Sequence, residues 1–150
     1  MTTKRIIYSI LLILTFALIF YFSSEDAIKS GNTSSRTMSF IADVFNVKEN
    51  REDFIEKGIP YLRKIAHFLV FMLAGFWEIL LLNTFEGSDL KKIVLSALIG
   101  LTYAIIDELH QSLTPGRAPR LIDVIIDFEG NLIGILFILQ FIIQKRKRTK

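Results

Sequence analysis

The chain has 150 residues, of which 51% are hydrophobic and 22% charged, and its formal net charge is +3. This length predicts one domain, covering residues 1–150. Cysteine is absent, which excludes a disulfide framework, a thiolate nucleophile and a zinc–thiolate site. Redox chemistry therefore gives no information about the compartment.

The apolar residues gather into long blocks and do not recur at an amphipathic period. A helix rises ~1.5 Å per residue, so each block reaches roughly 25 to 35 Å, enough for a hydrocarbon core of about 30 Å. No small-residue cleavage site follows Phe22, so we expect the first block to be a retained helix and not a signal peptide. We predict an all-α membrane protein with four transmembrane helices, at about 6–22, 60–82, 90–109 and 121–143.

Positive charge gathers at the two ends of the chain. The basic residues there are Lys4, Arg5, Lys145, Arg146, Lys147, Arg148 and Lys150. Basic tails beside membrane helices stay in the cytoplasm, so we expect a multi-pass protein of the cell membrane with both termini cytoplasmic. The C-terminal tail then serves as an orientation signal that touches anionic lipid, and we expect no nucleic-acid partner. With four spans, residues 23–59 and 111–120 lie outside and residues 83–89 inside.

The long segment between the first two spans begins with a serine-rich run and continues with Met38, Ile41, Val44 and Phe45 at helical spacing. This pattern predicts a short amphipathic helix in the outer interface. Such a helix could cap the bundle, or it could act as a lid or an entry ramp for lipid. We take the cap as the expectation because amphipathic stripes usually serve packing.

Polar and small residues form one stripe on each of the later three spans. The second span carries Arg63, His67, Ala74 and Glu78; the third carries Ser96, Gly100, Tyr103, Asp107 and His110 or Gln111; the fourth carries Asp123, Asp127, Gly130, Asn131 and Gly134. Small residues four apart let helices approach closely in lipid, so we expect the stripes to face each other. Ionisable groups near a membrane boundary are the default place to look for function. We predict one outer cavity lined by Arg63, His67, Asp107, Glu108, His110, Gln111, Arg117, Asp123 and Asp127.

Some of these residues have a simpler structural interpretation. Asp123 could cap a helix N-terminus and do nothing else. Lys64 suits an anchor at the lipid head groups. Glu78 lies near the inner end, where we expect it to snorkel or to pair with the loop. Pro115 and Gly116 suit the central positions of a type II turn, which would direct Arg117 over the cavity.

The chain resembles the VanZ-like family of membrane proteins, whose namesake is associated with teicoplanin resistance in bacteria. The resemblance covers about residues 20–138. It rests on Phe22-Ser23-Ser24, Arg63-Lys64-Ile65-Ala66-His67-Phe68, Asp107-Glu108-Leu109-His110-Gln111, Pro115-Gly116-Arg117 and Asp123-x-x-x-Asp127-x-x-Gly130-x-x-x-Gly134. Phe71 stands where members commonly carry tyrosine. The resemblance implies a multi-pass protein of the bacterial envelope linked to the glycopeptide response, and it implies no settled reaction.

The residues themselves leave several functions open. As an enzyme, the chain would use His67 and His110 for proton exchange near neutral pH, with Asp107, Glu108 or Asp127 as orienting groups or bases. Arg63 and Arg117, assisted by Gln111 and Asp123, would bind the phosphate or carboxylate of an anionic lipid or a lipid-linked cell-wall precursor. A metal-dependent variant of the enzyme would use His67, His110 and carboxylates. No close-set metal-ligand motif appears, so we predict no metal and leave any cofactor undetermined. The alternatives are a non-catalytic envelope modulator, a transporter, and a bundle whose charges only stabilise the fold.

Overall fold

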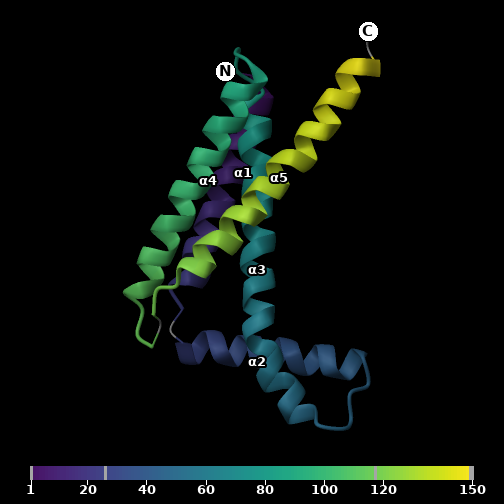
Figure 1. Cartoon of the computed structure of the whole chain (residues 1–150), viewed down its shortest axis with the longest axis vertical. Helices are drawn as coiled ribbons and strands as arrows, with labels where there is room; N and C mark the ends of the chain where they lie inside the picture. Colours follow the sequence, from purple (N-terminus) through teal and green to yellow (C-terminus); the bar gives the residue numbers. More distant parts are fainter. Residues whose placement is uncertain (1, 26, 117, 149–150) are drawn as a thin grey trace.

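The computed structural model describes residues 2–25, 27–116 and 118–148, excluding the side chains of residues 27–29. The described residues form five helices: α1 (Thr3–Ser23), α2 (Ala27–Val44), α3 (Arg51–Leu82), α4 (Asp89–Ser112) and α5 (Leu121–Arg148) (Figure 1). No strand occurs in this part of the chain. The prediction of an all-helical fold is confirmed.

Three of the described helices, α1, α3 and α4, are long and apolar enough to cross a membrane. Their outward surfaces carry large apolar side chains, such as Ile13 with 65% and Leu98 with 55% of its surface exposed. Such surfaces suit contact with lipid. The helix α5 is not among these three, although it is 28 residues long. The four-span count therefore stays a prediction.

The helix α3 is longer than the apolar block that predicts it, because it begins at Arg51 and passes through Pro60. Glu52 and Asp53 lie in its first turn, where carboxylates interact favourably with the positive end of the helix dipole. Proline offers no N–H to the preceding turn, yet the helix continues through it. The polar first turns of α3 therefore extend the helix beyond the bundle, toward α2 (Figure 1).

The helix α2 lies across the end of the bundle and packs against α3 (Figure 1). Its buried residues follow steps of four: Ser30, Ser34, Met38 and Ala42. The packed face of α2 is thus largely serine and alanine. Of the predicted apolar stripe, this face includes Met38. Val44 is 63% exposed, and Phe45, 75% exposed, lies just beyond the helix end. The four-residue steps thus turn a face to α3 that differs from the apolar stripe. The interfacial position of this helix and its role as a cap stay predictions.

The tightest helix pair is α3 with α5, and glycines on α5 permit it. A Cβ atom at Gly130 would lie 2.3 Å from the carbonyl oxygen of Phe68, and one at Gly134 would lie 2.0 Å from that of Met72. No Cβ fits at such distances, so the two backbones are in direct contact. On α4, a Cβ at Gly100 would lie 2.2 Å from the side-chain oxygen of Asn131. The predicted close packing of the small-residue stripes is confirmed.

Both termini lie at one end of the molecule, together with the loop between α3 and α4 (Figure 1). Arg5 donates to the backbone oxygen of Thr84 at 2.7 Å, and its guanidinium lies 3.9 Å from the centre of the Phe85 ring. Arg146 donates to Asp89 at 2.7 Å. The helix α2 and the loop between α4 and α5 lie at the opposite end (Figure 1).

Candidate functional site

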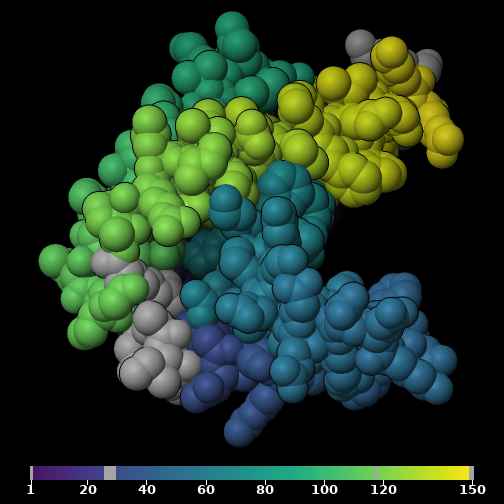
Figure 2. Space-filling view, turned by 60° about the horizontal axis from the view of Figure 1, so that its bottom comes forward, coloured from purple at the N-terminus to yellow at the C-terminus, as the bar shows by residue number. Residues whose placement is uncertain are grey.

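A cavity of about 600 Å³ lies between α1, α2, α3 and the start of α5. The surface is hollowed between α2 and the first turns of α5 (Figure 2). Its lining includes the cationic side chains of Arg63, Lys64 and Arg120, and the hydroxyl-bearing residues Ser30, Thr33, Ser34 and Thr37 of α2. Leu18, Phe22 and Val70 supply apolar walls. Glu25, Asp123 and Asp127 also line it, so the cavity combines cations, carboxylates and hydroxyl groups with apolar surface.

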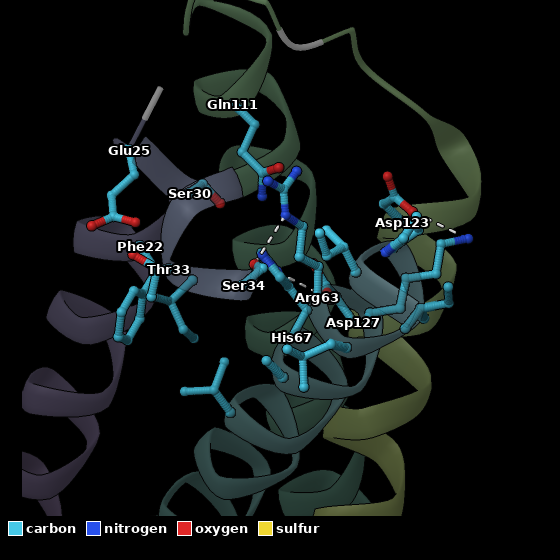
Figure 3. Close-up of a pocket in the computed structure, with 18 of the residues that line it drawn as sticks. Phe22, Glu25, Ser30, Thr33, Ser34, Arg63, His67, Gln111, Asp123 and Asp127 are labelled. Atoms are coloured by element: carbon cyan, nitrogen blue, oxygen red, sulfur yellow. Dashed lines mark hydrogen bonds and ion pairs between the residues drawn. The ribbon is translucent and has the colours of Figure 1, made fainter. Parts of the chain in front are cut away.

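Arg63 and Lys64 stand side by side on α3 at this cavity. The Arg63 Nε atom donates to Ser34 Oγ on α2 at 3.3 Å, which links the two helices (Figure 3). Lys64 Nζ lies 4.0 Å from Asp123 Oδ1 on α5. Asp123 lies in the first turn of α5, so its carboxylate meets the positive end of the helix dipole and also lines the cavity. Both of the roles considered for Asp123 are thus compatible with its position.

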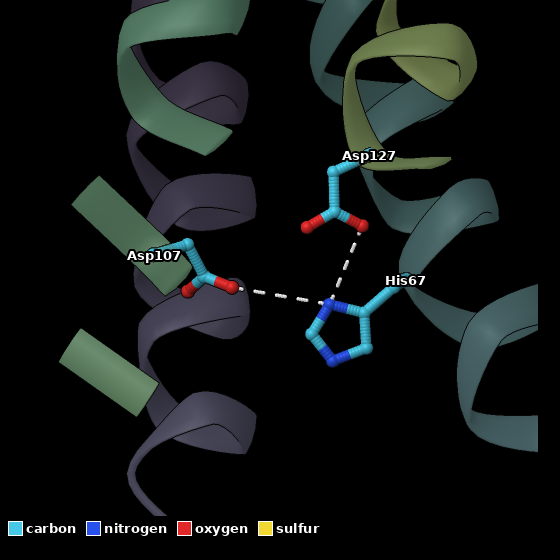
Figure 4. A group of neighbouring side chains, drawn as sticks. All are labelled: His67, Asp107 and Asp127. Atoms are coloured by element: carbon cyan, nitrogen blue, oxygen red, sulfur yellow. Dashed lines mark ion pairs between the residues drawn. The ribbon is translucent and has the colours of Figure 1, made fainter. Parts of the chain in front are cut away.

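His67 and Asp127, which line the cavity, meet Asp107 beside it, and each of the three comes from a different helix (Figure 4). His67 Nδ1 lies 3.5 Å from Asp127 Oδ1 and 3.9 Å from Asp107 Oδ2. Both aspartate side chains are 2% exposed, whereas that of His67 is 25% exposed. A titratable ring in contact with the cavity is thus held against two buried carboxylates.

Gln111 fixes one side of this cluster. Its Nε2 atom donates to Asp107 Oδ2 at 2.7 Å and to Ser23 Oγ at 3.3 Å. Ser23 ends α1 and is fully buried, so this amide joins α1 to the carboxylate on α4. The serine was part of the sequence resemblance but not of the predicted site, and its burial gives it a positioning role.

Glu108 and His110 point elsewhere. A Glu108 oxygen accepts the backbone N–H of Arg120, which secures the loop that enters α5. Glu108 also borders a second, shallower groove beside the start of α5. His110 Nε2 lies 3.0 Å from Ser24 Oγ, and its ring stacks on Phe20 with centroids 4.3 Å apart.

The predicted site residues thus fall into groups. Five of them line the cavity: Arg63, His67, Gln111, Asp123 and Asp127. Asp107 lies behind this lining, in contact with His67 and Gln111, and Glu108 and His110 also lie outside the lining. Arg117 lies outside the described residues. The positive φ expected at Gly116 is confirmed, with a value of 78°.

A second polar group lies deeper in the bundle, and here the expectation for Glu78 is wrong. Glu78 neither snorkels nor pairs with the loop: it is 1% exposed and accepts a hydrogen bond from Asn131 Nδ2 at 2.9 Å. Asn131 is one turn beyond Asp127 on α5, so both side chains lie on the helix face that is turned toward α3 and Glu78. Their spacing in the sequence was the available signal for this pair.

The geometry supports two kinds of chemistry. His67, beside two carboxylates, could exchange protons with a molecule in the cavity. The same three residues each offer one ligand atom, and these atoms all lie within 4.8 Å of one another, so they could also hold a metal ion. Arg63 could donate two hydrogen bonds to a phosphate or carboxylate.

The long apolar helices and this buried polar cluster define a helical membrane protein. The family model described as VanZ/LLP1 matches residues 7–144. The chain belongs to the VanZ/LLP1 family, and the resemblance seen in its motifs is confirmed. No curated protein and no solved structure matches the chain.

Proposed function

We propose that the chain is a multi-pass protein of the bacterial cell membrane whose cavity binds, or acts on, an anionic lipid or a lipid-linked cell-wall intermediate. The head group would enter from the outer leaflet. The observation that carries the proposal is the position of Arg63, which lines the cavity between the hydroxyl-rich face of α2 and the cluster of His67 with Asp127.

The charges at the two ends support one orientation in the membrane. The end that holds both termini carries the basic tail of α5 and Arg5. Positive charge favours the cytoplasmic side, and this supports our proposal that the cavity faces the outer side. In this arrangement α5 is the fourth span, and α2 lies in the outer interface with Phe40, Val44 and Phe45 in the head-group region.

The cavity suits an amphipathic molecule with a negative head group. Arg63, Lys64 and Arg120 provide positive charge, and hydroxyl groups of α2 provide further hydrogen bonds to phosphate oxygens. The walls formed by Leu18, Phe22 and Val70 suit the first part of an acyl or prenyl chain. Asp123 and Asp127 disfavour a second negative charge near the start of α5.

Membership of the VanZ/LLP1 family supports a role in the envelope, and we propose a link to the response to teicoplanin. Binding alone could alter envelope composition by occupancy, without a reaction. His67 between two carboxylates favours a reaction that includes proton transfer. Lipid extracts distinguish these outcomes, since catalysis changes the chemical identity of a lipid and occupancy changes only its distribution.

Lipid binding tests the proposal directly. The purified full chain should retain phosphatidylglycerol in preference to phosphatidylcholine, measured by native mass spectrometry from mixed micelles. Arg63→Gln should weaken phosphatidylglycerol binding by about 10-fold or more, because a charge-assisted hydrogen bond contributes roughly 1.5–3 kcal/mol. Lys57→Gln is the matched control, since Lys57 is an exposed α3 cation paired with Asp53 at 2.9 Å. Equal loss in both variants, or no preference for the anionic lipid, would contradict the proposal.

A further inference from the structure

We propose that His67, Asp107 and Asp127 form a binding site for one divalent transition-metal ion, with the open coordination positions directed toward the cavity. The ligand atoms would be His67 Nδ1 and one oxygen from each carboxylate, supplied by α3, α4 and α5 (Figure 4). The inference goes beyond the head-group proposal and does not depend on it.

The spacing of the three side chains is the first argument. The separations of 3.5 Å and 3.9 Å from His67 Nδ1 to the aspartate oxygens exceed the length of a good hydrogen bond, about 2.7–3.2 Å. Tetrahedral zinc with ligands at about 2.0–2.2 Å from the metal holds those ligands about 3.3–3.6 Å apart. All three ligand atoms lie within 4.8 Å of one another, so they surround a point at which a small cation fits after shifts of up to about 1 Å.

The second argument is an unsatisfied buried oxygen. The Asp127 side chain is only 2% exposed. Its Oδ2 atom is buried and has no hydrogen-bond partner among the described residues. Its carboxylate points at His67 and Asp107 (Figure 4). A buried carboxylate oxygen without a partner is costly, and coordination to a cation is one of the few ways to satisfy it.

The charges of the three side chains also favour a divalent cation. A protonated imidazole would neutralise only one of two ionised aspartates and would leave a net negative charge in a buried place. A divalent cation with a neutral imidazole neutralises both carboxylates, which lowers the cost of burying them. One nitrogen and two carboxylate oxygens suit Zn²⁺ or Mn²⁺.

The surroundings resemble the outer shell of a metal site. The Gln111 N–H that donates to Asp107 Oδ2 at 2.7 Å orients this carboxylate, as outer-shell partners do for ligands. His67 and Asp127 both line the cavity, so water or a phosphate oxygen could complete the coordination. If the head-group proposal also holds, the ion would polarise a phosphoryl oxygen placed beside Arg63.

Metal binding by the purified full chain tests the site. After treatment with EDTA and dialysis against Zn²⁺ or Mn²⁺ without lipid, we expect one ion per chain by elemental analysis. His67→Ala, Asp107→Asn and Asp127→Asn should each weaken binding by about 100-fold or more, because even outer-shell changes cost 10–100-fold. Glu129→Gln removes an exposed carboxylate two residues after Asp127 on α5 and should leave binding unchanged.

Cobalt provides a second readout, and circular dichroism distinguishes a lost site from a lost fold. Co²⁺ should give visible ligand-field bands with the wild-type chain, and these should be absent in Asp127→Asn, whose helix content by circular dichroism should match the wild type. The inference is overturned if the wild-type chain binds neither Zn²⁺ nor Mn²⁺, or if Asp127→Asn binds as tightly as wild type. Phosphatidylglycerol binding that persists without metal binding would overturn this inference alone, since the lipid assay tests the other proposal.

Discussion

Asn131 of α5 donates its side-chain N–H to Glu78 of α3 at 2.9 Å, in the interface where the two helices approach most closely. Both side chains are buried, at 0% and 1% exposure. If one of the two side chains were removed, neither water nor lipid could easily replace it as a hydrogen-bond partner at such a buried position. The pair therefore ties the polar stripes of α3 and α5 together below the cavity.

Removal of this pair should reveal energetic coupling. We expect Glu78→Ala and Asn131→Ala each to lower the free energy of unfolding in detergent by about 1–3 kcal/mol, because each leaves a buried polar group unpaired. The double variant should cost less than the sum of the two, by roughly 1 kcal/mol, in the range found between membrane helices. Strictly additive costs in denaturant titrations would show that the two side chains do not act together.

The contact between α5 and the α3 backbone leads to a second prediction. Gly134→Ala would place a Cβ atom 2.0 Å from the Met72 carbonyl oxygen, so the helices must separate. We expect a loss of about 1–3 kcal/mol or more, seen as a lower melting temperature in detergent. Gly31→Ala is the control, because the nearest atom to its Cβ is Arg63 Nη2 at 3.5 Å, an ordinary contact. Equal melting temperatures for the two variants would contradict the packing described.

The helices were accessible from the sequence because their signals are local. Blocks of apolar residues and the small residues at 130 and 134 predict long helices in close contact, and Gly134 does meet the backbone of α3. The start of α3 at Arg51 was less accessible, since its first turns are polar and Pro60 suggests a boundary. The face that α2 buries was also not predictable, because it depends on the docking of Met38 against Gly58.

The site could be predicted only to the level of helix faces. Spacing places Asp107 and Gln111 on one face of α4, and they do form a hydrogen bond. His110 precedes Gln111 by one residue. Successive residues of a helix are rotated by about 100°, so His110 faces Phe20 and Ser24 instead. The position of Glu108 could be predicted only from the course of the loop between α4 and α5, because its partner is the backbone N–H of Arg120. Such differences depend on helix rotation and loop path, which the sequence pattern does not determine.

The orientation can be tested by chemical labelling, because the chain contains no cysteine. Lys48→Cys lies in the exposed loop between α2 and α3, and Glu86→Cys lies in the exposed loop between α3 and α4. In intact cells a membrane-impermeant maleimide should label Lys48→Cys and should not label Glu86→Cys until the cells are opened. The reverse pattern would show that the cavity faces the cytoplasm.

The chain's two histidines provide a matched pair for the envelope phenotype. His67 touches the buried carboxylates, whereas His110 stacks on Phe20 outside the cavity lining. If the chain protects cells against teicoplanin, His67→Ala should abolish the protection and His110→Ala should preserve most of it. The minimal inhibitory concentration measures this, with membrane protein levels checked by immunoblot. If a well-expressed His67→Ala variant still protects cells, the protection does not depend on the cluster of His67 with the buried carboxylates.

A crystal structure of the chain with a short-chain phosphatidylglycerol tests the central claim most directly, because the claim is that one cavity built from several helices receives an anionic head group. We expect density for the phosphate within hydrogen-bond distance of the Arg63 guanidinium and the Ser34 hydroxyl, which line that cavity. Density for the lipid only on the outer apolar surface of the bundle, with no phosphate beside Arg63, would contradict the account.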